Sequence, residues 1–307
     1  EENGVALKFE ASVAGGIPIV NAFNNGLNAN NISKFMGIFN GTSNFILSKM
    51  THEQTTFKDA LEEAQRLGFA EADPTDDVEG VDAARKVVIT SYLSFNQVIK
   101  LNDVKSVGIS DITLADINAA SALNYKIKSI GKGTYENGYV NASVEPTLIH
   151  KNHQLAAVEN EYNAIYVIGD AVGDTMFYGK GAGSLATGSA VVSDLLNVAL
   201  FFESNLHTLP PHFELKTEET KEMMDGAEPV VIQEKSNYYI VISNNNKSLE
   251  KVEYDIKKKL PFHKSLQLVE RDQDTYAIIV TGIETSPEKV LNQSGFNIKK
   301  VYPVEGV

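Results

Sequence analysis

Residues 67–86 read LGFAEADPTDDVEGVDAARK, and the fold is organised around them. Within this stretch lie six acidic residues: Glu71, Asp73, Asp76, Asp77, Glu79 and Asp82. Carboxylates crowded in this way repel one another, so the crowding needs a structural or chemical reason. Pro74 excludes a continuous helix, whereas Gly80 followed by an apolar run with helical spacing predicts that a new helix begins there. Asp82 and Lys86, four residues apart, then share one face of that helix.

Spacing alone leaves two interpretations of the acidic stretch open. In the first, the acids form a solvated loop at a helix N-terminus, and Asp82 with Lys86 is an ordinary surface ion pair. In the second, they form a small polar pocket in which carboxylates hold an ammonium group and Lys86, placed by Asp82, transfers a proton. Burial would lower the lysine pKa and neighbouring acids would raise it, so the sequence does not fix its value.

Length and composition predict a globular protein with two domains. The chain has 307 residues, of which 43% are hydrophobic and 22% charged, enough for a sizeable core. A net charge of -13 argues against nucleic acid or an anionic membrane as a partner. The absence of cysteine excludes disulfides and thiolate chemistry, and the histidine spacing does not support a zinc site. No apolar run approaches the ~20 residues of a membrane-spanning helix, and we expect a cytoplasmic protein.

The first residues, EENGVALKFEAS, show neither an initiator methionine nor a signal sequence. We expect a helix end capped by Gly4 and a strand over 5–10, as in a chain cut from a longer one. The next segment, ASVAGGIPIVNAF, predicts a glycine-broken turn into a helix that begins near Pro18. Beside Glu10, such a turn could coordinate a small hard cation through main-chain oxygens, or be only a tight turn.

The pattern over residues 1–207 predicts an α+β fold. A strand at 32–40 leads into a helix whose N-terminus, rich in Asn40 and its neighbours, could receive an anion or be only capped. Two alternating strands around the Glu-Asn-Gly turn at 136–138 predict a hairpin, and further strands are expected at 163–169 and 175–178. We therefore expect a mixed or antiparallel sheet with helices on one face.

A polar stretch at 208–235, which contains a Pro-Pro pair, predicts a linker between two domains. The residues that follow, 236–307, have the order βαββαβ, which suits a ferredoxin-like module. This module contains no catalytic constellation, so its fold supports regulation only by analogy. A spacer or dimer-stabilising domain is the alternative.

A late glycine loop, at Gly179, Gly181 and Gly183, lies between an expected strand and an expected helix at 187–203. A loop of this kind at a helix N-terminus can approach a phosphate or a dinucleotide. Its spacing is not G-x-G-x-x-G, so a flexible connecting loop is equally consistent with the pattern.

Taken together, these segments resemble the homoserine dehydrogenases of the monofunctional bacterial type. The similar segments are EASVAGGIPI, GIFNGTSNFIL, GFAEADPTDDVEGVDAARK, GDAVGDTMFYGKGAG and the C-terminal module. The resemblance covers essentially the whole of this chain, but it matches only the later part of a family member's sequence. Members begin with a nucleotide-binding Rossmann domain, which we expect this chain to lack.

The resemblance implies a reaction and roles for four residues. Members reduce L-aspartate 4-semialdehyde to L-homoserine with NADPH or NADH, on the route to threonine, methionine and isoleucine. Lys86 matches the general acid/base and Asp82 its orienting partner, while Glu71, with Asp77 nearby, matches the group that holds the substrate amino group. In the reducing direction, the Lys86 ammonium would give a proton to the developing alkoxide. Without its cofactor domain, we expect the chain to be inactive.

The same resemblance implies a sodium site, formed by the Glu10 side chain and the carbonyl groups of Val13, Gly15 and Ile17.

For the cofactor, NADP or NAD, the resemblance implies contacts with Gly181 and Gly183. Ala186 and Gly188 stand where a Pro-Thr-Ala run is usual in the family, which weakens this expectation. The C-terminal module resembles an ACT domain, whose usual ligand is an amino-acid effector, with threonine the obvious candidate. We also expect a homodimer or higher homo-oligomer.

Two other classes of function stay open. The chain could be a non-catalytic amino-acid-binding regulatory protein, or an oligomerisation module with vestigial sites. Binding of threonine, homoserine and NADPH distinguishes the three hypotheses.

Overall fold

The computed structural model describes residues 7–203, 236–243, 247–260, 263–283, 287–292 and 296–306. The strands are β1 (Ile32–Ile38), β2 (Lys105–Ser106), β3 (Tyr125–Glu136), β4 (Tyr139–His150), β5 (Tyr162–Gly169), β6 (Gly173–Lys180), β7 (Ser236–Ser243), β8 (Ser265–Asp272), β9 (Thr275–Ile283) and β10 (Ile298–Glu305). The α-helices are α1 (Ile19–Asn21), α2 (Gly41–Glu53), α3 (Phe57–Leu67), α4 (Thr75–Val78), α5 (Val81–Phe95), α6 (Leu114–Ala122), α7 (Ser184–Glu203), α9 (Leu249–Lys259) and α10 (Pro287–Asn292). Among the described residues, no helix is long and apolar enough to cross a membrane.

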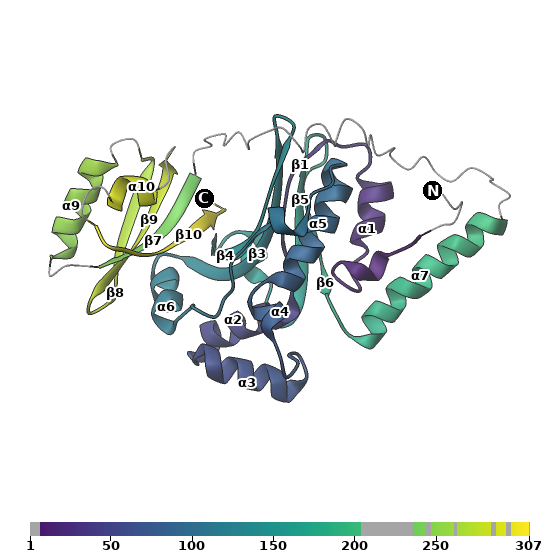
Figure 1. Cartoon of the computed structure of the whole chain (residues 1–307), viewed down its shortest axis with the longest axis horizontal. Helices are drawn as coiled ribbons and strands as arrows, with labels where there is room; N and C mark the ends of the chain where they lie inside the picture. The colour runs from purple at the N-terminus through teal and green to yellow at the C-terminus, as the bar shows by residue number, and fades with distance from the viewer. Residues whose placement is uncertain are drawn as a thin grey trace.

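The strands form one mixed sheet, which confirms the expected α+β class (Figure 1). Their order is β6-β5-β1-β3-β4-β10-β7-β9-β8, with β2 also paired to β4. Strand β4 pairs in parallel with β10 and with β2, and the other neighbours are antiparallel. The hairpin of β3 and β4 turns at Asn137 and Gly138, both with positive φ, as a two-residue turn with the right twist requires.

Helices α2, α5 and α6 cover one face of the first part of the sheet, as expected. Helix α2 is buried over most of its length, and α5 buries Ala83, Ala84 and Val87 against the sheet. In the C-terminal part, α9 packs on the opposite side of β7 and β9 from the core that contains α6. The order of the C-terminal elements is βαββαβ, as the pattern predicted.

The helix predicted after Gly80 is confirmed, whereas the short helix α4 within the acidic stretch was expected to be loop. Helix α3 ends at Leu67, the short helix α4 follows Pro74, and α5 begins directly after Gly80. Helix α4 ends at Val78, two residues before Gly80, and α5 begins at Val81 in contact with α4.

The strand expected at 5–10 is wrong where the structure describes it. Residues 7–9 are irregular and Glu10–Ser12 form a 3-10 turn. The Glu10 N–H donates to Asp194 Oδ2 of α7 at 2.9 Å, and its carboxylate accepts the N–H groups of Val20 and Asn21. The Glu10 N–H is therefore satisfied by a side chain of α7 and not by a neighbouring strand. Residues 1–6 lie outside the described part.

Both parts of the chain share the sheet, a connection that the sequence did not predict. Strand β10 continues it beside β4, where Val304 lies opposite Leu148. Glu305 accepts hydrogen bonds from Lys34 at 2.8 Å and Lys132 at 3.0 Å, both on the first part. The linker expected at 208–235 lies outside the described residues.

A second ion cluster joins the two parts at α6. Asp116 is fully buried and accepts bonds from Arg271 Nε and Lys300 Nζ, each at 2.8 Å. Burial alone would raise the pKa of Asp116, but the bonds from Arg271 and Lys300 lower it below its ordinary value. The junction therefore depends on a carboxylate that stays ionised inside the protein.

A buried lysine, Lys128, contacts helix α2 from the sheet. Lys128 of β3 is 2% exposed and donates to Val158 O at 2.6 Å and to Asn44 Oδ1 at 3.1 Å. Its Nζ also lies 3.3 Å from Glu159 Oε2, while Lys126 binds the other oxygen of the same carboxylate. Burial alone would raise the Glu159 pKa, but the charge of Lys128 and the bonds from Lys126 and Ser48 lower it to about 2.

Replacement Glu159→Gln is expected to destabilise the protein by about 2 kcal/mol at neutral pH. Because the folded-state pKa is depressed, this stabilisation is present above pH 4.5 and is lost as the pH falls toward 2. Urea unfolding of both proteins between pH 7 and 2.5 measures the difference. A difference that stays constant over this range would contradict the assignment, and Glu53→Gln, at an exposed ion pair, serves as control.

Candidate active site

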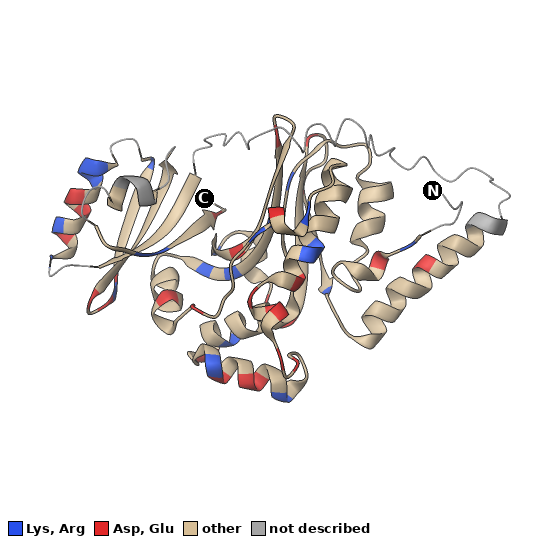
Figure 2. Cartoon of the chain, in the orientation of Figure 1, with Lys and Arg blue, Asp and Glu red and all other residues tan. Residues whose placement is uncertain are grey.

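A cavity of ≈ 770 Å³ opens where the acidic stretch meets the sheet. It is lined by the N-terminus of α2, the loop from Leu67 to Asp77, the first turns of α5, the start of β5 and the glycine loop between β6 and α7. Figure 2 shows acidic positions on α3 and along the loop that leads through α4 to α5. These segments, separated in sequence, meet at one edge of the sheet, and the cavity they enclose is named the acidic pocket below.

Lys86 lies in the acidic pocket with two fixed partners. Its Nζ donates to Asp82 Oδ2 at 2.7 Å and to the carbonyl oxygen of Phe39, at the end of β1, at 2.9 Å. The Lys86 side chain is 20% exposed, so the ammonium is held at the pocket wall rather than in solvent. An ammonium has three N–H donors, and the third has no partner assigned within the described residues. It is free to reach a ligand.

Asn40 connects the acids of the pocket. Its Nδ2 donates to Asp77 Oδ1 at 2.7 Å and to Asp82 Oδ2 at 3.0 Å, while its Oδ1 caps α2 by accepting Ser43 N. Because the Asn40 Oδ1 is held by the cap of α2, the Asn40 side chain has a fixed rotamer. Its Nδ2 in turn fixes the positions of the Asp77 and Asp82 carboxylates. Asp82 is therefore oriented from two sides, by Asn40 and by Lys86.

The six acids of the stretch have different partners. Asp76 pairs with Arg85 at 2.5 Å, Glu79 accepts from Ser110, and Asp73 accepts the N–H and hydroxyl of Thr75. The Thr75 bonds lower the pKa of Asp73. These three acids have local structural partners.

The carboxylate of Glu71, unlike those of the other five acids, has no partner among the described residues. Glu71 lines the acidic pocket, and its carboxylate makes no ion pair with any residue that the structure describes. Its backbone carbonyl is held by Gln65 Nε2 at 3.1 Å, which fixes the main chain and leaves the side chain available. The carboxylate can therefore accept a cationic ligand group.

The two glycine segments of the chain contact each other at the pocket. Gly16 N donates to Lys180 O at 3.0 Å, and a Cβ added at Gly15 would lie 2.3 Å from Gly181 O. Gly15 has φ +53°, which also favours glycine. A larger residue at position 15 would therefore push the loop at 180–183 away from the early turn.

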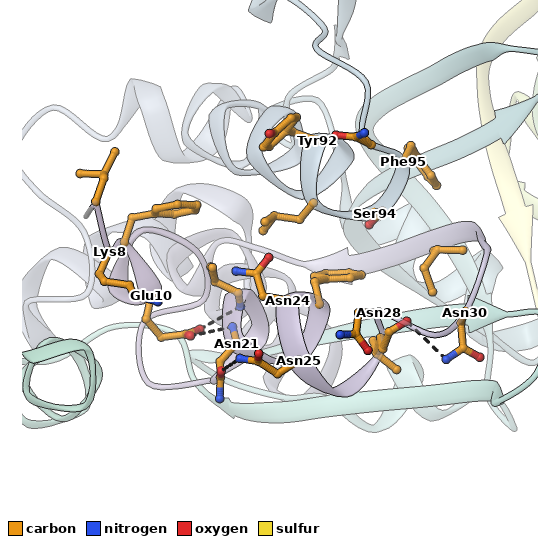
Figure 3. Close-up of a pocket in the computed structure, with 18 of the residues that line it drawn as sticks. Lys8, Glu10, Asn21, Asn24, Asn25, Asn28, Asn30, Tyr92, Ser94 and Phe95 are labelled. Atoms are coloured by element: carbon orange, nitrogen blue, oxygen red, sulfur yellow. Dashed lines mark hydrogen bonds between the residues drawn. The ribbon is translucent and has the colours of Figure 1, made fainter. Parts of the chain in front are cut away.

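Glu10 lies at one end of a second cavity, of ≈ 540 Å³, shown in Figure 3. Asparagine side chains line much of it, among them Asn21, Asn24 and Asn28. The Glu10 carboxylate accepts N–H groups of Val20 and Asn21, each at 2.8 Å. Burial raises the Glu10 pKa, which these two bonds partly oppose.

The structure brings six residues singled out from the sequence to one pocket: Lys86, Asp82, Glu71, Asp77, Gly181 and Gly183. Glu10, by contrast, lines the second cavity. The sequence did not single out Lys180 or Asn163 among the lining residues, and Asn40 was named only as part of a capped helix start. A lone asparagine at the start of a strand has no spacing signal that would have revealed it.

Comparison with known proteins gives two family matches. Residues 18–196 match the model described as homoserine dehydrogenase, and residues 235–307 match the homoserine dehydrogenase C-terminal domain. Homoserine dehydrogenase of Bacillus subtilis is 54% identical over 198 residues, which are 64% of this chain and 46% of the relative. That of Pseudomonas aeruginosa is 47% identical over 211 residues, or 69% of this chain and 49% of the relative. The chain thus spans about half the length of these curated relatives.

Solved structures agree with the sequence matches. Staphylococcus aureus homoserine dehydrogenase at pH 7.5 superposes with a TM-score of 0.83 and 70% identity, over 100% of this chain and 70% of that one. Homoserine dehydrogenase of Thiobacillus denitrificans superposes with a TM-score of 0.82 and 35% identity, over 99% of this chain and 71% of that one. These matches place the α+β fold described above among the structures of homoserine dehydrogenases. The chain belongs to the homoserine dehydrogenase family.

Proposed function

We propose that this chain provides the substrate pocket for reduction of L-aspartate 4-semialdehyde to L-homoserine with NADPH or NADH. The observation that supports it most directly is the Lys86 ammonium, 2.7 Å from Asp82, in one pocket with the unpaired carboxylate of Glu71. A proton donor and a free anionic group in one cavity suit a substrate that has both a reacting carbonyl and an ammonium.

In this proposal, Lys86 is the general acid. Phe39 O and Asp82 hold two of its three N–H donors, so the third is directed at the substrate oxygen that becomes the hydroxyl. Asp82, itself held by Asn40, keeps the ammonium in place and offsets its charge. In the oxidation of homoserine, neutral Lys86 would accept the same proton.

The ammonium and the carboxylate of the amino-acid substrate would bind to different sides of the acidic pocket. Glu71, with Asp77 nearby, would accept the substrate ammonium through charge-assisted hydrogen bonds. The start of α2, at Gly41 and Thr42, also lines the pocket, and unpaired N–H groups at a helix N-terminus favour a carboxylate. The substrate would thereby be oriented with its aldehyde toward Lys86.

A nicotinamide cofactor, NADP or NAD, would supply the hydride. The residues of the glycine loop fit its approach, because Gly183 has no atom within 4 Å of an added Cβ, and the adjoining residues are exposed. A hyperthermophilic archaeal homoserine dehydrogenase mutant, solved in complex with NADPH, is 29% identical with a TM-score of 0.56. We therefore assign Gly181 and Gly183 to the cofactor side of the pocket.

A sodium ion is proposed beside Glu10, with the carbonyl groups of Val13, Gly15 and Ile17. The donor chemistry fits a hard cation, since a buried carboxylate and main-chain oxygens are its preferred ligands. Glu10 is 5% exposed, has Asp194 close by, and makes no ion pair with a described residue. A bound cation would balance this buried negative charge.

For the C-terminal module, we propose an ACT-like role, binding of an amino-acid effector such as threonine, within a homodimer or larger homo-oligomer. The βαββαβ order and the ion clusters that join the module to the sheet support transmission of such a signal.

Oxidation of NADPH by L-aspartate 4-semialdehyde, followed by absorbance at 340 nm, tests the proposed function on the protein expressed from its complete gene. Formation of homoserine should match NADPH consumption. Binding of threonine or homoserine by calorimetry, without any turnover, would instead favour the regulatory alternative.

Replacement Glu71→Gln is expected to raise KM for aspartate semialdehyde about 10- to 100-fold while kcat changes less than threefold. The charge-assisted bond to the substrate ammonium is lost, whereas Lys86 and Asp82 are untouched. Steady-state kinetics with saturating NADPH measure both constants. The control Glu62→Gln, a largely exposed residue of α3, should change neither, and an unaltered KM in Glu71→Gln would remove Glu71 from the substrate site.

A further inference from the structure

Asn163, the second residue of β5, has a buried carboxamide without an apparent structural purpose. The residue is 1% exposed, and its Oδ1 has no hydrogen-bond partner in the described structure. It nevertheless lines the acidic pocket. Folded proteins contain few buried polar atoms without partners, because each has given up water without replacing it. Such an atom at a pocket wall indicates a partner that arrives with a ligand or a movement.

The position of Asn163 is between the proton donor and the glycine loop. Its neighbour Ala164 pairs with Ile38 of β1, so Asn163 lies beside Phe39, the residue whose carbonyl accepts Lys86. On its other side, Asn163 pairs with Gly179 of β6. The carboxamide thus lies near the start of an inner strand, between β1 and β6, at the wall of the acidic pocket.

The glycine loop covers this carboxamide. A Cβ added at Gly181 would lie 2.1 Å from both Cγ and Nδ2 of Asn163, so the loop backbone packs directly on the side chain. A covered side chain that is 1% exposed cannot touch a bulky ligand itself. Any effect of Asn163 on a bound ligand must therefore be transmitted through the glycine loop.

The loop is held on both sides of an exposed segment, because a Cβ added at Gly16 would lie 2.9 Å from Ala186 Cβ. Lys180 O accepts Gly16 N at 3.0 Å, and Gly15 packs against Gly181 O. Beyond this anchor, residues 182–185 are exposed, and Gly183, with φ +107°, has no atom within 4 Å of an added Cβ. The backbone N–H groups of 182–184 lie in this exposed segment, so a small local shift can bring one of them to Asn163 while Gly181 and Ala186 stay in place.

We propose that Asn163 is a positioning residue for the cofactor. When a nicotinamide cofactor fills its side of the pocket, a backbone N–H of residues 182–184 donates to Asn163 Oδ1, and this bond holds the loop against the cofactor. The inference rests on the proposed function, because the cofactor is the ligand that the loop would contact.

The test is Asn163→Leu in the protein expressed from its complete gene. We expect NADPH to bind about tenfold more weakly in a fluorescence titration, the loss of one hydrogen bond. KM for aspartate semialdehyde should stay within twofold. The thermal midpoint without ligand should be equal or higher, because leucine replaces an unpaired polar group of similar size.

Asn44→Leu is the matched control. Asn44 is also 1% exposed, but its Nδ2 donates to Asn160 O at 2.8 Å and its Oδ1 accepts Lys128 Nζ. This variant should lower the thermal midpoint without a selective loss of NADPH affinity. The two asparagines thus distinguish a structural carboxamide from one that acts only when the cofactor is bound.

Unchanged NADPH affinity in Asn163→Leu would overturn the proposal. So would a fall of its thermal midpoint to that of Asn44→Leu, since the carboxamide would then already have a partner in the free protein. A parent protein that binds NADPH but does not reduce the semialdehyde would contradict the proposed function alone. A parent that binds no NADPH would overturn both.

Discussion

Replacement Lys86→Ala is expected to reduce kcat for aspartate semialdehyde about 10³-fold, with a much smaller change in KM. The variant removes the only lysine that the structure places against Asp82 and Phe39 O in the described pocket, and general acid catalysis contributes about 10² to 10⁴ to such rates. Steady-state kinetics at saturating NADPH measure the effect.

A second variant separates charge from proton transfer. Lys86→Arg keeps a cation beside Asp82, but an arginine does not release its proton in proteins, so activity should stay low. The control Lys49→Ala removes a lysine that also pairs four residues along a helix, with Glu53, and should leave activity unchanged. Activity of Lys86→Ala within threefold of the parent would exclude Lys86 as the acid.

Replacement Asp116→Ala is expected to destabilise the protein by about 3–5 kcal/mol. The substitution removes the buried anion that binds Arg271 and Lys300. The Arg271 side chain is only 10% exposed, and a buried charge without a partner is strongly destabilising. Urea unfolding at pH 7 measures the loss. We also expect the C-terminal module to become more susceptible to proteolysis, because its ion cluster with α6 is gone.

The pH dependence and a matched control sharpen this test. Because the folded-state pKa of Asp116 is lowered, its contribution is present above pH 3.8 and falls as the pH drops further. Asp255 also binds two lysines, Lys247 and Lys251, but at the surface, so Asp255→Ala should change stability little. Equal effects of the two variants would mean that burial of Asp116 has no energetic weight.

The sequence predicted those features that local chemistry specifies. Gly80 placed the start of α5, and Asn137 with Gly138 placed the hairpin, because each position restricts φ and ψ by itself. The short helix α4 was not predicted. The spacing of Asp82 and Lys86 likewise predicted their pairing, since residues four apart on a helix are neighbours.

Features that depend on distant partners were not predicted. The segment 5–10 has the composition of a strand, yet Glu10 is held by Asp194, 184 residues away. The link from Glu305 to Lys34 and Lys132, and the contact of Gly15 with Gly181, also join segments that no local pattern connects. Of the pocket lining, the sequence therefore singled out residues of the acidic stretch, but neither the bonds from Asn40 to Asp77 and Asp82 nor Asn163.

The parallel pairing of β4 with β10 has a consequence for biosynthesis. Roughly 150 residues separate Leu148 from its partner Val304, so the ribosome releases β3 and β4 long before β10 exists. Until then β4 has an open edge beyond the short strand β2, and open edges invite pairing with other nascent chains. The open edge of β4 is therefore the place where incorrect pairing can compete with folding until β10 has been synthesised.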